Sequence, residues 1–131
     1  MKTLLALPFI ALPLVALSAT LPALVLIAAT PAMAATPGLG DLTMFEKIAS
    51  DTLMLVEKGD LPAAKKRITD FETAWDKAQP RLYHLDKTEW GVVDDAADKA
   101  ISSLRSAKPN ATEAKTSVSG LIAAIKHPST P

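Results

Sequence analysis

Residues 61–78 read LPAAKKRITDFETAWDKA, and this stretch decides the fold. Its apolar positions recur at alternating spacings of three and four residues: Leu61, Ala64, Ile68, Phe71, Trp75 and Ala78. That spacing places the six side chains on one face of an α-helix and leaves the charged residues on the other faces. An apolar stripe of this length must be covered by other apolar surfaces, so the stretch predicts a helix packed within an all-α domain.

The residues on either side of this stretch mark where the helix begins and ends. Gly59 suits the position after a helix where the backbone turns left-handed, and Asp60 is well placed to cap the next helix. Pro62 is tolerated in a first turn. Pro80 disfavours a helical conformation in Gln79, so the helix is predicted to stop there, with residues 80–85 forming a loop.

Three more helices are predicted, over residues 42–58, 86–108 and 110–127. Their predicted caps are Asp41, Asp86 with Glu89 three residues on, and Asn110 with Glu113 three residues on. Their inward residues are Leu42, Phe45, Ile48 or Ala49, Thr52, Leu55 and Val56, then Trp90, Val93, Ala97, Ile101 and Leu104, and last Ala114, Val118, Leu121, Ile122 and Ile125. Because short connections favour antiparallel neighbours, residues 41–127 predict an antiparallel up-down four-helix bundle. A flexible lead-in over residues 35–40 and a disordered tail over residues 128–131 complete the prediction.

The first 34 residues have a different composition. Lys2 is followed by a run from Leu4 to Ala34 without one charged side chain, and this run ends in the small-x-small pattern Ala32-Met33-Ala34. These features predict a signal peptide that is cleaved after Ala34, with a periplasmic or secreted product. A retained transmembrane anchor is the alternative. Prolines within the run, among them Pro8, Pro13 and Pro22, speak against a membrane helix.

Composition removes several classes of function. The 14 basic residues balance the 14 acidic ones, and no basic stripe of the kind that binds nucleic acids is present. The mature domain also lacks the Lys/Arg-rich amphipathic helix of a membrane-surface protein, so we expect no membrane contact for it. The chain has no cysteine, and therefore no disulfide or thiol nucleophile. It contains no catalytic or cofactor-binding motif, so neither an enzymatic activity nor a cofactor is predicted.

One end of the predicted bundle is the first candidate site. The topology gathers most of the aromatic residues there, with Trp75, Tyr83, His84 and Trp90 forming a candidate pole for a partner or ligand. We expect Trp75 and Trp90 to meet across the hairpin. The alternative is that both tryptophans cap the core, with their N–H groups at a wet edge.

A group of carboxylates is the second candidate site, made up of Glu72, Asp76, Asp94 and Asp98 with Asp95 beside them. We expect Glu72 to lie near Asp94 across the hairpin. Such an acidic face suits a hard cation, whereas Met44, His84 and His127 suit a soft metal. No Glu-x-x-His motif of di-iron bundles occurs. The alternative is a set of surface ion pairs with Arg67, Lys99 and Arg105.

About two thirds of the mature chain resembles small uncharacterised periplasmic helical proteins of Gram-negative bacteria. The resemblance rests on Gly59-Asp60, Ala63-Ala64-Lys65, Asp70-Phe71-Glu72, Ala74-Trp75-Asp76, Trp90, Asp94, Asp98 and Arg105. It implies an envelope location and a helical fold, and it brings no activity with it.

Taken together, these features predict an exported helical-bundle binding or accessory protein that acts through protein–protein contact in the cell envelope. The alternative is a periplasmic metal-binding protein that uses the acidic face or the His/Met pole.

Overall fold

The computed structural model describes residues 38–128, and these residues form four α-helices and no strand. The helices are α1 (Thr43–Glu57), α2 (Leu61–Leu85), α3 (Lys87–Arg105) and α4 (Ala111–Lys126). The predicted all-α class is confirmed for this part of the chain. The predicted signal peptide, residues 35–37 and residues 129–131 lie outside the described residues.

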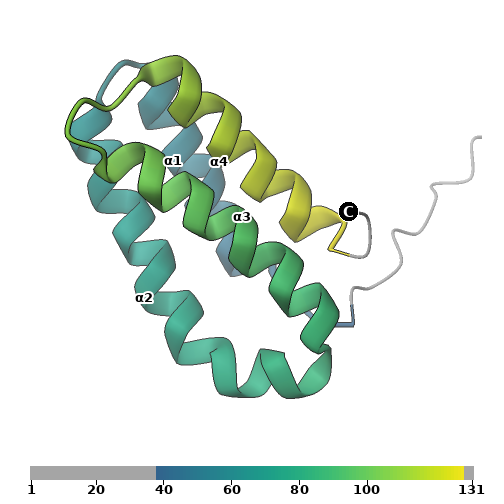
Figure 1. Cartoon of the computed structure of the whole chain (residues 1–131). Coiled ribbons are helices and arrows are strands. Elements are labelled where there is room, and N and C mark those ends of the chain that lie inside the picture. Colours follow the sequence, from purple (N-terminus) through teal and green to yellow (C-terminus); the bar gives the residue numbers. More distant parts are fainter. Residues whose placement is uncertain (1–37, 129–131) are drawn as a thin grey trace, which may run out of the picture. The chain divides into compact units, whose positions relative to one another are not determined.

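Each helix packs mainly against two others, α1 and α3 both against α2 and α4. Figure 1 shows α2 and α3 side by side and joined at the turn around Asp86, with α4 next to α3. The predicted inward stripes meet between the helices, where Phe45, Ile68, Phe71, Val118 and Leu121 are almost completely buried. Burial of these side chains is the main force that holds the helices together.

The predicted capping residues of α2, α3 and α4 and the glycine after α1 are confirmed. Gly59 adopts φ 78°, and the N–H groups of Gly59 and Asp60 donate to the carbonyls of Val56 and Leu55, each at 3.0 Å. These two bonds satisfy carbonyls that the end of α1 leaves free. The Asp60 carboxylate accepts from Ala63 N, that of Asp86 from Glu89 N, and the Asn110 amide oxygen from Thr112 N and Glu113 N. The N-cap residue of α1 is Leu42 rather than the predicted Asp41, although the Asp41 carboxylate accepts from Thr43 N at 2.9 Å.

The predicted loop over residues 80–85 is wrong, because α2 continues through Pro80 to Leu85. Proline lacks the N–H that would donate to the carbonyl of Asp76, so its presence weakens the helix at this point. Leu82 lies two helical turns beyond Trp75 and is fully buried. Its burial extends the apolar stripe by two turns and outweighs the local cost of the proline. The hairpin therefore turns at Asp86.

Two further boundaries differ from the prediction. The supposedly flexible lead-in is anchored at Leu39, which is 0% exposed and donates its backbone N–H to the Glu89 carboxylate at 3.3 Å. The last predicted turn of α3 is absent, because the helix ends at Arg105 and residues 106–110 are exposed. Beyond Leu104 no apolar side chain is buried before α4, so nothing there compensates for ordering another turn.

Candidate functional site

Trp75 belongs to the core rather than to a pole. Its side chain is 3% exposed and packs edge-on to Phe45 at 5.0 Å and stacked with Phe71 at 5.9 Å, measured between ring centroids. Its indole N–H donates to the Asp94 carboxylate at 2.9 Å and so joins α2 to α3. The alternative reading of this residue, as a core tryptophan with a satisfied N–H, is the one the structure supports.

The expected pairing of Trp75 with Trp90 is wrong, since Trp75 packs on Phe45 and Phe71 whereas Trp90 packs on Tyr83. The reason is the continuation of α2. Six extra helical residues lengthen the helix by about 9 Å, at 1.5 Å per residue, and they move Trp75 away from the turn. Trp75 then lies opposite Asp94, and Tyr83 takes the place opposite Trp90.

The other pole residues do gather where α2 passes into α3. We call this surface the hairpin tip and define it as Arg81, Tyr83, His84, Leu85, Lys87 and Trp90. The Tyr83 ring lies edge-on to that of Trp90 at 5.2 Å and to that of His84 at 6.3 Å. The Lys87 amine lies 5.5 Å from the centroid of the Tyr83 ring, within range of a cation–π contact.

Two features of the hairpin tip are unusual for a free surface. Leu85 is 53% exposed, although leucine is usually buried. The indole N–H of Trp90 is buried, and no hydrogen-bond acceptor for it is present among the described residues. Both features lie next to the turn at Asp86, where the sequence predicts a loop over residues 80–85 instead of the end of α2.

The predicted acidic face is divided among different partners. Glu72 lies opposite Arg105, whose Nη1 donates to its Oε1 at 3.0 Å, and not opposite Asp94 as expected. The predicted pairing of Arg105 with this face is therefore seen, whereas Arg67 pairs with Asp51 at 2.8 Å and Asp70 at 3.2 Å. Asp76 and Asp98 are exposed.

Asp94 is the perturbed member of this group. Burial raises its pKa above the ordinary value, and the nearby carboxylates of Asp98, Asp95 and Asp76 act in the same direction. The hydrogen bond from Trp75 opposes this shift because it favours the ionised form.

The residues of the proposed soft-metal site are distributed over separate surfaces. Met44 lies with Asp70 and Lys77 in a groove between α1 and α2, His84 lies on the hairpin tip, and His127 lies at the end of α4. Across residues 38–128 no group of three His, Asp or Glu side chains has the arrangement of a metal site.

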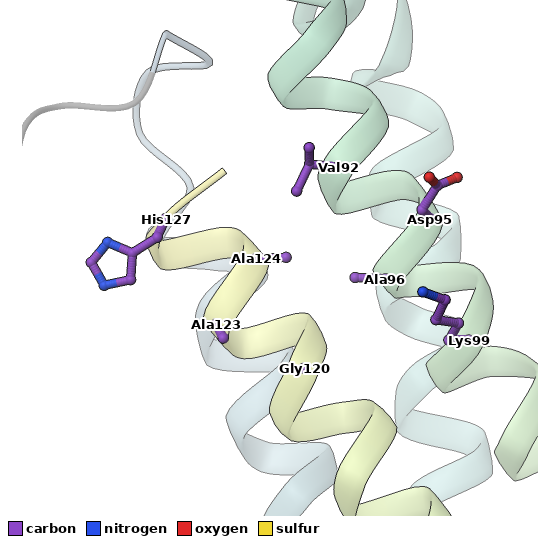
Figure 2. A pocket seen from close by; sticks show the side chains of 8 residues that line it. All are labelled: Val92, Asp95, Ala96, Lys99, Gly120, Ala123, Ala124 and His127. Atoms are coloured by element: carbon purple, nitrogen blue, oxygen red, sulfur yellow. The ribbon is translucent and has the colours of Figure 1, made fainter. Parts of the chain in front are cut away.

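A groove between α3 and α4 is the feature that sequence reasoning missed. It has a volume of about 650 Å³ and is lined by Val92, Asp95, Ala96 and Lys99 of α3 and by Gly120, Ala123, Ala124 and His127 of α4. Figure 2 shows Ala96 and Ala124 pointing into the space between the two helices. A neighbouring hollow of about 540 Å³ shares Ala96, Lys99 and Gly120 and extends to Thr116 and Ser117. Small residues next to the apolar stripe of α4 were its only sequence signal.

None of the helices within residues 38–128 has both the length and the apolar composition needed to cross a bilayer. Comparison of the chain with protein families, with curated proteins and with solved structures found no match.

Proposed function

We propose that this chain is an exported binding or accessory protein that acts through protein–protein contact in the cell envelope. In this proposal the segment up to Ala34 is a cleaved signal peptide, and the mature part is an antiparallel up-down four-helix bundle in the periplasm or outside the cell. The observation that carries the proposal is the groove between α3 and α4.

The lining of this groove suits a partner helix. Ala96, Gly120, Ala123 and Ala124 carry at most one side-chain carbon, so the backbone of a partner can come close to α3 and α4. Asp95 and Lys99 add charges of both signs along α3, where they can select the partner's register. An amphipathic helix that lies in a groove is a common mode of recognition between proteins.

A pair of serines between α3 and α4 supports binding rather than catalysis. The Ser103 hydroxyl lies 2.7 Å from that of Ser117 and donates to the Ala100 carbonyl, so it makes structural bonds within and between helices. A serine nucleophile would instead need a base within hydrogen-bond reach. We therefore propose no enzymatic activity.

Gly120 offers a direct test of the groove. A Cβ added at Gly120 meets no neighbouring atom within 4 Å, and the same holds for Gly91 on α3. Gly120→Phe is expected to fill the groove without disturbing the fold, whereas Gly91→Phe is a control that leaves the groove open. A photo-crosslinker at Ala123 should capture an envelope protein in the wild type and in the Gly91 variant, and capture should be lost in the Gly120 variant. Equal capture by all three proteins would exclude this groove as the binding site.

Export needs a separate test. The mature protein is expected to start at Ala35 and to be released with the periplasmic or external fraction. N-terminal sequencing of the protein recovered from the envelope checks both points.

Metal binding is the second candidate function. Burial raises the pKa of Asp94 most, and the nearby carboxylates of Asp98, Asp95 and Asp76 add to this shift. The negative charge of these carboxylates favours the binding of a cation at this face. Titration calorimetry with Ca²⁺, Zn²⁺, Cu²⁺ and Fe²⁺ tests it, with Asp94→Asn as the variant expected to lose binding. If none of the four ions gives a heat of binding, metal binding is excluded as a function of this face.

A further inference from the structure

The hairpin tip combines three kinds of side chain that proteins place at membrane surfaces. Leu85 is 53% exposed, Tyr83 and Trp90 are partly exposed and pack against each other, and Arg81 and Lys87 are exposed. Aromatic rings with polar atoms favour the headgroup region, and basic side chains favour anionic lipids. A single exposed leucine needs no explanation, but a leucine within such a group is unusual for a surface in water.

The acidic side chains of the same turn are engaged by the protein itself. The Asp86 carboxylate accepts from Glu89 N at 2.9 Å, and the Glu89 carboxylate is buried and accepts from Leu39 N. His84 is also exposed. The exposed side chains of residues 81–90 are those of Arg81, His84, Leu85, Lys87 and Thr88, and Tyr83, Asp86 and Trp90 are partly exposed.

The N-terminal part of the chain joins the bundle at this same place. A Cβ at Gly38 would lie 3.1 Å from the carboxylates of both Asp86 and Glu89, and Leu39 is buried beside them. Ala34, the end of the uncharged run that starts at Leu4, precedes Gly38 by four residues. Four residues span at most about 14 Å, so a membrane that holds the run near Ala34 also keeps Gly38 close to its surface.

We propose that the hairpin tip is a lipid-contacting surface that rests on the headgroups of an anionic membrane while the N-terminal run is still attached. The inference rests on the proposed export. It differs from the expectation of no membrane contact for the mature domain, which considered only amphipathic helices. The apolar and aromatic side chains supply contact with the interface, and Arg81 and Lys87 supply selectivity for anionic lipids.

The chain contains no cysteine, so single labels can be placed without other changes. Leu85→Cys carries a fluorescent label at the tip, and Met54→Cys carries it at a position of nearly equal exposure, 51%, three residues before the end of α1. The full chain is mixed with vesicles of phosphatidylcholine and phosphatidylglycerol. The label at position 85 should be protected from iodide and quenched by brominated lipids, whereas the label at position 54 should stay accessible to iodide.

The contribution of charge is tested in the labelled Leu85→Cys protein. Arg81→Gln and Lys87→Gln should each lower the ratio of bound to free tip about fivefold on anionic vesicles and leave it unchanged on phosphatidylcholine alone. Equal accessibility of the two labels overturns the proposal. Protection at position 85 without quenching by brominated lipids also overturns it, because that result means contact with another protein. Neither outcome affects the groove, whose test depends on Gly120 and Ala123.

Discussion

At the scale of single residues, Asp94 links chemistry to stability. Burial and the neighbouring carboxylates raise its pKa above 3.8, so the folded protein binds this proton more tightly than the unfolded chain. The stability contributed by Asp94 is therefore fully present below pH 3.8 and is lost as the pH rises through the raised value. Asp94→Asn keeps an oxygen that can accept from Trp75 and removes the charge. We expect the variant to match or exceed the wild type in unfolding free energy at pH 7 and to lose this advantage near pH 4.

Urea unfolding followed at several pH values measures this effect. Asp98→Asn serves as a control, because Asp98 is exposed and affects Asp94 only through the repulsion between their charges. Asp98→Asn should change the unfolding free energy at pH 7 in the same direction as Asp94→Asn, but by a smaller amount. A loss of stability in Asp94→Asn at pH 7 would show that the ionised form strengthens the bond to Trp75 by more than burial costs.

The two tryptophans should respond differently to truncation. Trp75 is buried against Phe45 and Phe71, so Trp75→Ala is expected to cost about 3–5 kcal/mol of unfolding free energy. Trp90 is only partly buried and should cost less on truncation to Ala. Thermal and urea unfolding compare the two variants. Equal costs would contradict the assignment of Trp75 to the core and Trp90 to the tip.

At the scale of helices, α2 is stabilised by packing despite an unfavourable residue. Pro80 removes one backbone hydrogen bond from the helix interior, so Pro80→Ala is expected to raise the unfolding free energy by about 1–2 kcal/mol. Pro62 is the matched control, since it occupies the first turn, where no N–H is needed. Pro62→Ala should leave stability unchanged or lower it by up to about 1 kcal/mol. Stability changes of the same sign in both variants would mean that Pro80 does not interrupt α2.

At the scale of the whole molecule, Leu39 and Leu42, which precede α1, are part of the core. Leu39 is fully buried, so Leu39→Ala is expected to cost about 2–5 kcal/mol. Leu85→Ala, at an exposed position, is expected to stay within about 0.5 kcal/mol of the wild type. Chemical denaturation compares the two leucines. Hydrogen exchange at the Leu39 amide, which is bonded to Glu89, provides a second measurement, and fast exchange there in the wild type would show that the segment is not anchored.

Local signals predicted much of the architecture. The stripe from Ala64 to Trp75, the glycine after α1 and the polar caps of α2, α3 and α4 are found as expected. Each depends on residues within a few positions in the sequence, where spacing or one side chain decides the conformation. Sequence reasoning failed at Pro80 and at the lead-in because it took a single breaker residue, or a cluster of turn formers, as decisive.

The candidate sites were harder to predict than the helices. The sequence predicts that Trp75 pairs with Trp90 and that Glu72 lies near Asp94. Both predictions are wrong because they assume that α2 ends six residues earlier than it does. A register error of this size changes every cross-hairpin neighbour while leaving the apolar faces correct. The groove at Ala96 and Gly120 had no strong sequence signal, because small residues are also common at tightly packed helix contacts.

The amino-acid sequence alone determined that most of residues 41–127 form amphipathic helices, where most of these helices begin, and which faces they bury, because periodicity and capping are local. Only the tertiary structure decided that α2 runs through Pro80 and that Leu39 enters the core. It likewise decided that Tyr83 and Trp90, rather than Trp75, form the hairpin tip. These features depend on apolar area that is buried between segments far apart in the chain. The free energy gained by this burial cannot be read from any local stretch, and it is larger than the local conformational preferences that oppose it.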